Sequence, residues 1–96
     1  MAKVTILYWQ DIPSVVEARE GRDKHKIELS LRFQELIDLV AMRKGMMGTD
    51  EYLLQWAKGK PEEHDGGAEA AATAVAEEIE SRFDAIRAEE LAKCKE

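Results

Sequence analysis

Side chains that commonly bind metals or transfer protons stand next to one another at Glu62-Glu63-His64-Asp65. Ligands on neighbouring positions of a polar segment rarely converge on one ion, and neither a second histidine nor a cysteine cluster lies close in sequence to complete a set. We therefore predict a solvated loop here and no metal site.

The other residue patterns of known chemistry are missing from the chain. It has no glycine-rich phosphate loop, no His and Glu at metal-binding spacing on a helix, and no nucleophile elbow. Cys94, the one cysteine, lies between two lysines without a histidine close in sequence, so we expect a structural or incidental thiol. The sequence thus indicates no catalytic residue and no cofactor, which favours a non-enzymatic role.

Basic residues gather around Gly21 in a chain that is acidic overall. The hairpin tip predicted there carries Arg19, Arg22, Lys24, His25 and Lys26, which could receive an acidic partner or a phosphate. The alternative is a solvated tip, because charges at hairpin ends keep edge strands soluble. We include Arg19, Arg22 and Lys24 in a candidate interaction surface.

Two apolar groups complete the candidate interaction surface. Tyr8 and Trp9 could stack on a ligand or partner, and the alternative for both is core packing with the ring O–H and N–H at the rim. Met46 and Met47 lie between two expected helices and could form an adaptable contact surface. The alternative for the methionines is that they fill gaps between those helices.

Length and charge limit the class of protein. The 96 residues are enough for one domain with a modest core. The formal net charge of −6 argues against nucleic acid or an anionic membrane as the main partner, because phosphate groups are bound by clustered Lys and Arg. The chain has no apolar run of membrane-spanning length and no signal-peptide pattern, and its single cysteine suits a reducing compartment. We therefore expect a cytoplasmic protein.

The elements that position these residues begin with a sheet. Residues 4–9 are β-branched, aliphatic and aromatic on both faces, which predicts an interior strand that ends near Gln10, before Pro13. Residues 15–20 and 25–29 alternate across a loop containing glycine and aspartate, which predicts a hairpin. Because the connections are short, we expect a three-stranded antiparallel sheet. Whether residues 15–20 pair with the first strand stays open.

Helices follow the sheet. Apolar residues recur at helical spacing from a cap at Ser30 to a stop at Gly45, and a second, short helix begins at Thr49 and ends at Gly59. An amphipathic helix and a sheet bury their apolar faces against each other. We therefore predict an α+β fold in which two helices cover the N-terminal sheet and residues 1–60 form the core domain.

The C-terminal third has a different composition. Residues 61–67 read as a polar linker, and residues 68–96 are rich in Ala and Glu, which predicts one long amphipathic helix. This helix needs a surface for its apolar stripe, either the core domain or a partner. The stripe consists of Val75, Ile79, Phe83, Ile86 and Leu91.

Two sequence runs carry a family resemblance. They are Tyr8-Trp9-Gln10-Asp11-Ile12-Pro13 and Gly48-Thr49-Asp50-Glu51-Tyr52-Leu53. With these runs in this order, about residues 2–60 resemble a small bacterial family known as the virulence factor domain. Stand-alone members of that family are often encoded beside folate- and corrinoid-dependent methyltransferases. The resemblance therefore implies a place in one-carbon metabolism, and it carries over no catalytic residues.

Three functions remain open. We expect first a non-enzymatic accessory module that binds a protein partner through Trp9, the basic tip and the methionines, linked to folate- or corrinoid-dependent methyl transfer. The second is a small enzyme or a binder of a folate- or pterin-like ligand, which would stack on Tyr8 or Trp9 and place a carboxylate on Arg19 or Arg22. The third is a self-associating module that forms a homodimer through the C-terminal helix.

Overall fold

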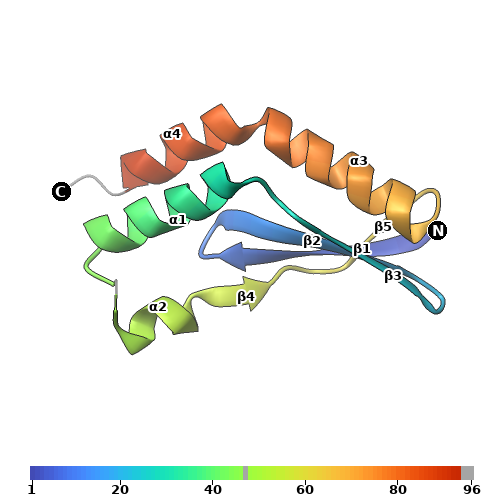
Figure 1. Ribbon diagram of the computed structural model, residues 1–96, viewed down its shortest axis with the longest axis horizontal. Coiled ribbons are helices and arrows are strands. Elements are labelled where there is room, and N and C mark those ends of the chain that lie inside the picture. Colours follow the sequence, from blue (N-terminus) through green and yellow to red (C-terminus); the bar gives the residue numbers. More distant parts are fainter. Residues whose placement is uncertain (47, 94–96) are drawn as a thin grey trace.

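Helices cover one side of an antiparallel sheet in this protein (Figure 1). The computed structural model describes residues 1–46 and 48–93, and within them the chain forms five strands and four helices. The fold class is α+β, as the sequence predicts. In chain order the elements are β1 (Ala2–Trp9), β2 (Ile12–Glu20), β3 (Asp23–Glu28), α1 (Leu31–Arg43), α2 (Asp50–Leu54), β4 (Trp56–Lys58), β5 (Glu62–His64), α3 (Ala68–Ser81) and α4 (Phe83–Lys93).

Strand β1 lies in the interior of the sheet, as its apolar composition predicts. The strand order is β3-β2-β1-β4, and β5 also pairs with β1. Strand β2 pairs with both β1 and β3, which answers the question that the sequence left open. On the other edge of β1, β4 pairs with Leu7–Trp9 and β5 pairs with Ala2–Val4, so two short strands together cover that edge.

The prediction of three strands is corrected by β4 and β5. Trp56 was expected in the second helix, but α2 ends at Leu54 and Trp56 begins β4. The expected linker over residues 61–67 contains β5. Three-residue strands are too short to show a period, and Glu and His have no preference for strands. They form because the edge of β1 presents N–H and C=O groups that need partners.

A tight turn and a bulge join β1 to β2. Gln10 adopts a left-handed backbone angle (φ 55°), and its N–H donates to the carbonyl of Gln55 at 3.0 Å. Pro13 was expected to lie outside the strands, yet it pairs with Tyr8 inside β2. The pairing register shifts there, and this irregularity accommodates a residue that has no N–H to donate.

Helix α3 lies across the sheet, while α1 packs on β2 and α4 packs on α1 (Figure 1). Small residues on α3 let it approach the strands closely; Ala71 and Ala72 are almost fully buried. The apolar stripe predicted for the C-terminal region therefore packs on the chain's own core. The largest fully buried side chains are Trp9, Phe33, Ile12, Ile37, Val16 and Val40.

The single C-terminal helix expected from the composition is instead two helices. Helix α3 ends at Ser81 and α4 starts at Phe83, with Arg82 out of helical geometry between them. The break lets one apolar stripe follow two differently oriented surfaces, the sheet under α3 and α1 under α4. At the break, the Phe83 ring meets Phe33 of α1 edge to face, with 5.0 Å between ring centroids.

Glu80 fixes this break to the start of α1. The backbone N–H of Ser30 donates to Glu80 Oε2 at 2.6 Å, and the Ser30 hydroxyl donates to Oε1 at 2.8 Å. Arg32 donates to Oε1 at 3.0 Å and also lies over the Phe83 ring, 4.5 Å from its centroid. Ser30 was expected to cap α1 with its hydroxyl, but that hydroxyl is used on Glu80, and the helix has no side-chain cap.

We expect Glu80→Gln to destabilise the fold by about 1–2 kcal/mol at neutral pH, because the replacement amide turns an N–H₂ donor toward donors. Partial burial raises the pKa of Glu80, but the hydrogen bonds from Ser30 and Arg32 outweigh it, so the net pKa is lowered. A lowered folded-state pKa stabilises the fold above the pKa of the unfolded chain, and this contribution disappears as pH falls through the folded-state value.

Urea unfolding between pH 7 and pH 3 measures this effect. The stability difference between the wild type and Glu80→Gln should narrow as the pH falls. The matched control is Glu77→Gln, an exposed carboxylate on the same helix. A pH-independent difference for Glu80→Gln, or an equal effect from Glu77→Gln, would contradict the role assigned to Glu80.

Candidate functional site

One face of the sheet is left uncovered by α3, and α2 and the start of α1 adjoin this face at the end near Trp56. Val4 and Ile6 of β1 line a groove with Val75 and Ile79 of α3, so their side of the sheet faces the helices. The alternate positions of each strand point to the other side, which we call the open face. Strand register places the following side chains on it: Lys3, Thr5, Leu7, Val15, Glu17, Arg19, Lys24, Lys26, Glu28, Lys58 and Glu63.

Three hollows run along the open face and join into one groove. The first shares Leu7 and Val15 with the second. The second shares Thr5, Glu17 and Lys58 with the third. The groove therefore follows the strand direction and has an apolar end and a basic end.

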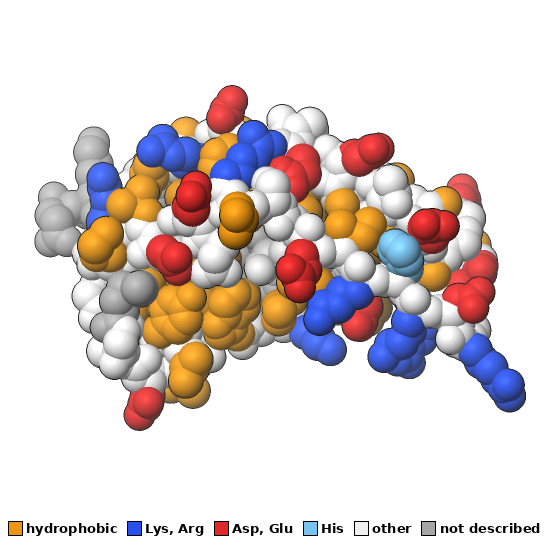
Figure 2. Space-filling view, in the orientation of Figure 1, with side chains coloured by type: hydrophobic (Ala, Val, Ile, Leu, Met, Phe, Trp, Pro, Cys, Tyr) orange, Lys and Arg blue, Asp and Glu red, His pale blue; other side chains and the backbone are white. Residues whose placement is uncertain are grey.

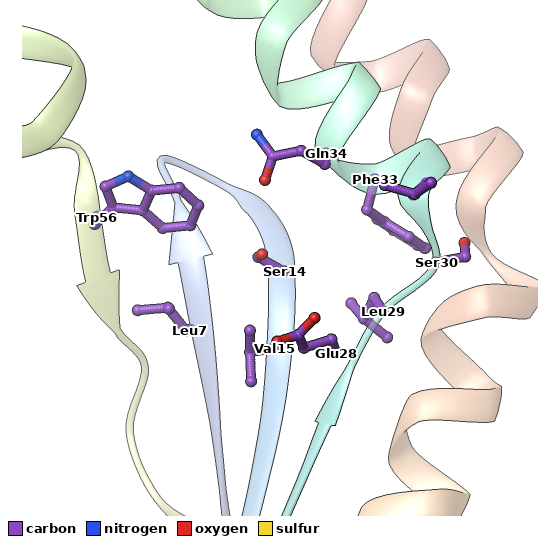
Figure 3. A pocket seen from close by; sticks show the side chains of 10 residues that line it. Leu7, Ser14, Val15, Glu28, Leu29, Ser30, Phe33, Gln34 and Trp56 are labelled. Carbon is purple, nitrogen blue, oxygen red and sulfur yellow. The ribbon is translucent and has the colours of Figure 1, made fainter.

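The apolar end is a cleft of about 410 Å³ between β4, the ends of β1 and β2, and the start of α1 (Figure 3). Trp56 of β4 forms one wall and Phe33 of α1 forms the opposite wall. Leu31 on its rim is 78% exposed. The remaining lining residues are Leu7, Ser14, Val15, Glu28, Leu29, Ser30 and Gln34.

Two fixed groups shape this cleft. The Trp56 ring meets the Tyr52 ring edge to face, with 6.4 Å between centroids, which holds the indole upright. The side-chain amide of Gln34 donates to Asp38 at 3.0 Å and to the Tyr52 hydroxyl at 3.5 Å. An aromatic wall with a few oriented polar groups is typical of sites that bind an apolar group.

The basic end is a row of three cations on neighbouring strands. Lys3 of β1 stands directly opposite Arg19 of β2, which stands directly opposite Lys24 of β3. Like charges at directly opposite positions destabilise a sheet. None of the ion pairs between the described residues includes one of these three side chains. Glu63 of β5 is opposite Lys3 at the end of the row.

The open face has the opposite charge to the whole chain. Five cations and three carboxylates stand on it, a net charge of +2, whereas the chain carries −6. Figure 2 shows Lys and Arg side chains along the lower edge of the molecule from its centre to the right, toward the β2–β3 hairpin. A positive face on an acidic protein attracts an acidic group to that face and repels it elsewhere.

Part of the predicted interaction surface lies on the open face. Arg19 and Lys24 both belong to the basic row. Arg22 lies in the exposed turn beside it. Met46 is half-buried against the Gln10 side chain, away from that row, and Met47 falls outside the described residues.

Tyr8 lies on the helix-covered side of the sheet, in the groove with Val4 and Ile6. A Cβ on Gly59 would come within 3.0 Å of the Tyr8 ring, so the small residue leaves room for it. Partial burial raises the pKa of the Tyr8 hydroxyl, and the carboxylates of Glu62 and Asp11 add to the rise, so the phenol is neutral at physiological pH.

The prediction that Trp9 belongs to the interaction surface is corrected, because its side chain is fully buried. Its indole N–H donates to the backbone carbonyl of Tyr52 at 2.9 Å, and the two rings lie 5.5 Å apart. This is the core-packing alternative that the sequence left open. The indole thereby ties α2, which contains Tyr52, to β1.

We expect Trp9→Ala to destabilise the fold by about 3–5 kcal/mol, because it leaves a large cavity and an unpaired carbonyl. Chemical denaturation checks this value, with Met42→Ala as the control. Met42 is 63% exposed, so its removal should change the stability by less than about 0.5 kcal/mol. A Trp9→Ala protein as stable as the control would contradict the core role.

The sequence interpretation missed Lys3, Lys58 and the cleft residues, although it did place Lys26 at the basic hairpin tip. Alternation along β3 carried a signal, since Lys24, Lys26 and Glu28 alternate with the partly buried His25 and Ile27. No local signal could show that Lys58 lies opposite Leu7, because the pairing joins segments about fifty residues apart.

The four potential metal ligands at 62–65 do not converge. Glu62, Glu63 and His64 form β5, where successive side chains point to opposite faces. Within residues 1–46 and 48–93, no group of three or more His, Cys, Asp or Glu side chains is arranged to hold a metal ion. The expected solvated loop is in part a paired edge strand.

These features define a two-layer α+β domain with a helical layer on one face of its sheet and a grooved, basic open face. The chain matches the family model described as virulence factor over residues 7–92, so it belongs to that family. The match extends beyond the runs quoted above and includes α3 and most of α4, in keeping with their packing on the core. Neither the curated proteins nor the solved structures contain a match to the chain. None of the helices in the described part of the chain is long and apolar enough to cross a membrane.

We expect Arg19→Glu to stabilise the isolated protein by about 0.5–1 kcal/mol, because it replaces two like-charge pairs by two opposite-charge pairs. The control is Arg22→Glu, which changes the net charge equally but lies outside the row. Urea unfolding compares the two variants. A destabilised Arg19→Glu, or an equal gain from Arg22→Glu, would show that the row carries no repulsion.

Proposed function

We propose that this chain is a non-catalytic interaction module that binds a partner protein on the open face of its sheet. The observation that carries the proposal is the row formed by Lys3, Arg19 and Lys24, a repulsive arrangement at the opposite end of the groove from an apolar cleft. Like charges at opposite positions, which form no ion pair within the described residues, lower the stability of the isolated domain, and an acidic partner relieves their repulsion on binding.

A protein partner fits the open face better than a nucleic acid does. Glu17 and Glu28 lie on the same face as the cations, and they repel a chain that carries a charge at every phosphate. An apolar cleft beside charged groups resembles the core and rim of a protein interface. The proposal therefore assigns the cleft to an apolar anchor and the basic row to carboxylates of the same partner.

The ligand-binding alternative required Tyr8 or Trp9 to stack on the ligand, and only Tyr8 is accessible. Trp9 is fully buried, and Tyr8 and the basic row lie on opposite faces of the sheet. One bound molecule does not reach both. The self-association alternative rested on an apolar stripe without a partner, and Val75, Ile79 and Phe83 of that stripe pack against the chain's own core.

We further propose that the partner belongs to folate- or corrinoid-dependent methyl transfer. Support for this step comes from the resemblance of the two sequence runs to the family, and from family membership over residues 7–92. The module would act as an accessory subunit that positions or recruits a methyl-transfer enzyme.

Site-specific photo-crosslinking in the source organism tests the proposal. A benzophenone amino acid at Thr5, in the middle of the groove, should crosslink to a methyl-transfer protein identified by mass spectrometry. The same group at Glu77, exposed on α3, is the matched control and should not crosslink to it. Arg19→Glu should abolish the crosslink from Thr5.

Equal crosslinking from Thr5 and Glu77, or a crosslink that survives Arg19→Glu, would contradict binding at the open face. A Thr5 crosslink to a protein of unrelated metabolism would retain the interaction module and remove the methyl-transfer link. No polypeptide crosslink at all would overturn the interaction module.

A further inference from the structure

We infer that the open face takes an extended acidic peptide segment with one large apolar anchor residue, placed about four positions from its carboxylates. This inference rests on the proposed function and deepens it by specifying the partner's chemistry. It is carried by the continuity of the groove, by the spacing of its two ends and by the distribution of charge along it.

The spacing follows from β1 itself. Leu7 lines the apolar cleft and Lys3 belongs to the basic row, so the two ends of the groove are four residues apart on one strand. At about 3.3 Å per residue in an extended chain, this separation is about 13 Å. An extended peptide lying along the strands advances at the same rate, so about four residues separate its anchor from its first carboxylate.

The apolar cleft selects the anchor. Its volume of about 410 Å³ falls in the range of roughly 300–1,000 Å³ that is typical of ligand pockets. Its walls are the Trp56 and Phe33 rings, with Leu7 and Val15 between them. Aromatic side chains that fill such a pocket supply much of the binding energy of an interface. The anchor is therefore Phe, Trp or a large aliphatic residue.

The charges along the groove favour a bound segment with separate carboxylates over a continuous polyanion such as a nucleic acid. Lys3 and Arg19 line one end of the groove, with Lys24 opposite Arg19 on the neighbouring strand, and Lys26 and Lys58 stand on either side of the middle. Glu17 also lines the middle, and Glu28 lines the cleft, where the anchor brings no charge. A phosphodiester chain would place a negative charge next to both carboxylates.

Synthetic peptides test the inference on the full chain by fluorescence anisotropy. Two fluorescein-labelled probes are used, since the peptide can run in either direction: one has a Phe about four residues before an Asp-Asp pair, and the other has the reverse order. At least one should bind, with an affinity that falls as salt rises. Matched probes replace Phe by Ala or the Asp pair by a Lys pair, and each should bind about tenfold or more weakly.

Substitutions at exposed positions test which end of the groove binds the Phe of the probe and which end binds its Asp pair. Leu31→Glu places a charge on the exposed rim of the cleft and should weaken the Phe probe about three- to tenfold, without weakening the Ala probe further. Met42→Glu is its control, because Met42 is also exposed on α1 and does not line the cleft. Arg19→Gln with Lys24→Gln should weaken the acidic probes by a similar factor and reduce their salt dependence.

Several results would overturn the inference. These are equal binding of the Phe and Ala probes, equal losses from Leu31→Glu and Met42→Glu, or tighter binding of a single-stranded oligonucleotide than of either acidic probe. A concentration-dependent dimer that Arg19→Glu dissolves would assign the face to a second copy of the chain instead. If neither probe binds while the Thr5 crosslink forms, the proposed function stands and the peptide inference fails; if both fail, the open face is not an interaction site.

Discussion

The backbone pairing of β1 is the constraint on which the rest of the structure depends. Of the strands described, β2, β4 and β5 each hydrogen-bond directly to β1, and only β3 is reached through β2. The backbone N–H and C=O groups of β1 need partners on both edges, and its apolar side chains need a covering layer. The two short strands on its outer edge and the helical layer above it meet these requirements.

Coverage of the sheet is one-sided, and this asymmetry creates the candidate site. The alanine-rich face of α3 packs closely on the strands, whereas α4 packs on α1. The hydrogen bonds that Glu80 accepts from Ser30 and Arg32 tie the end of α3 to the start of α1. Helix α3 is thereby held on one side of the sheet and α1 at its end, and the open face keeps its groove and cations that form no ion pair within the described residues.

The candidate site could be predicted only in part. Arg19 and Lys24 were selected because cations in an acidic chain stand out, and both lie in the basic row. Trp9 was included because its ring could stack on a ligand or partner, but its size and its indole N–H also suit the core, and the structure buries it. Trp56 was assigned to a helix from its neighbours in sequence, although pairing with Trp9 across the sheet determines its position.

The sequence by itself determined the elements whose signals are local. The apolar run of β1, the hairpin of β2 and β3, and the stripe of α1 all lie within about five to fifteen consecutive residues, where period and turn chemistry act directly. Tertiary structure alone decided the order of the strands, the break at Arg82 and the face left open. These features depend on pairings such as Leu7 with Lys58, which form only when distant segments compete for one edge or one apolar surface, and that competition leaves no pattern in either segment.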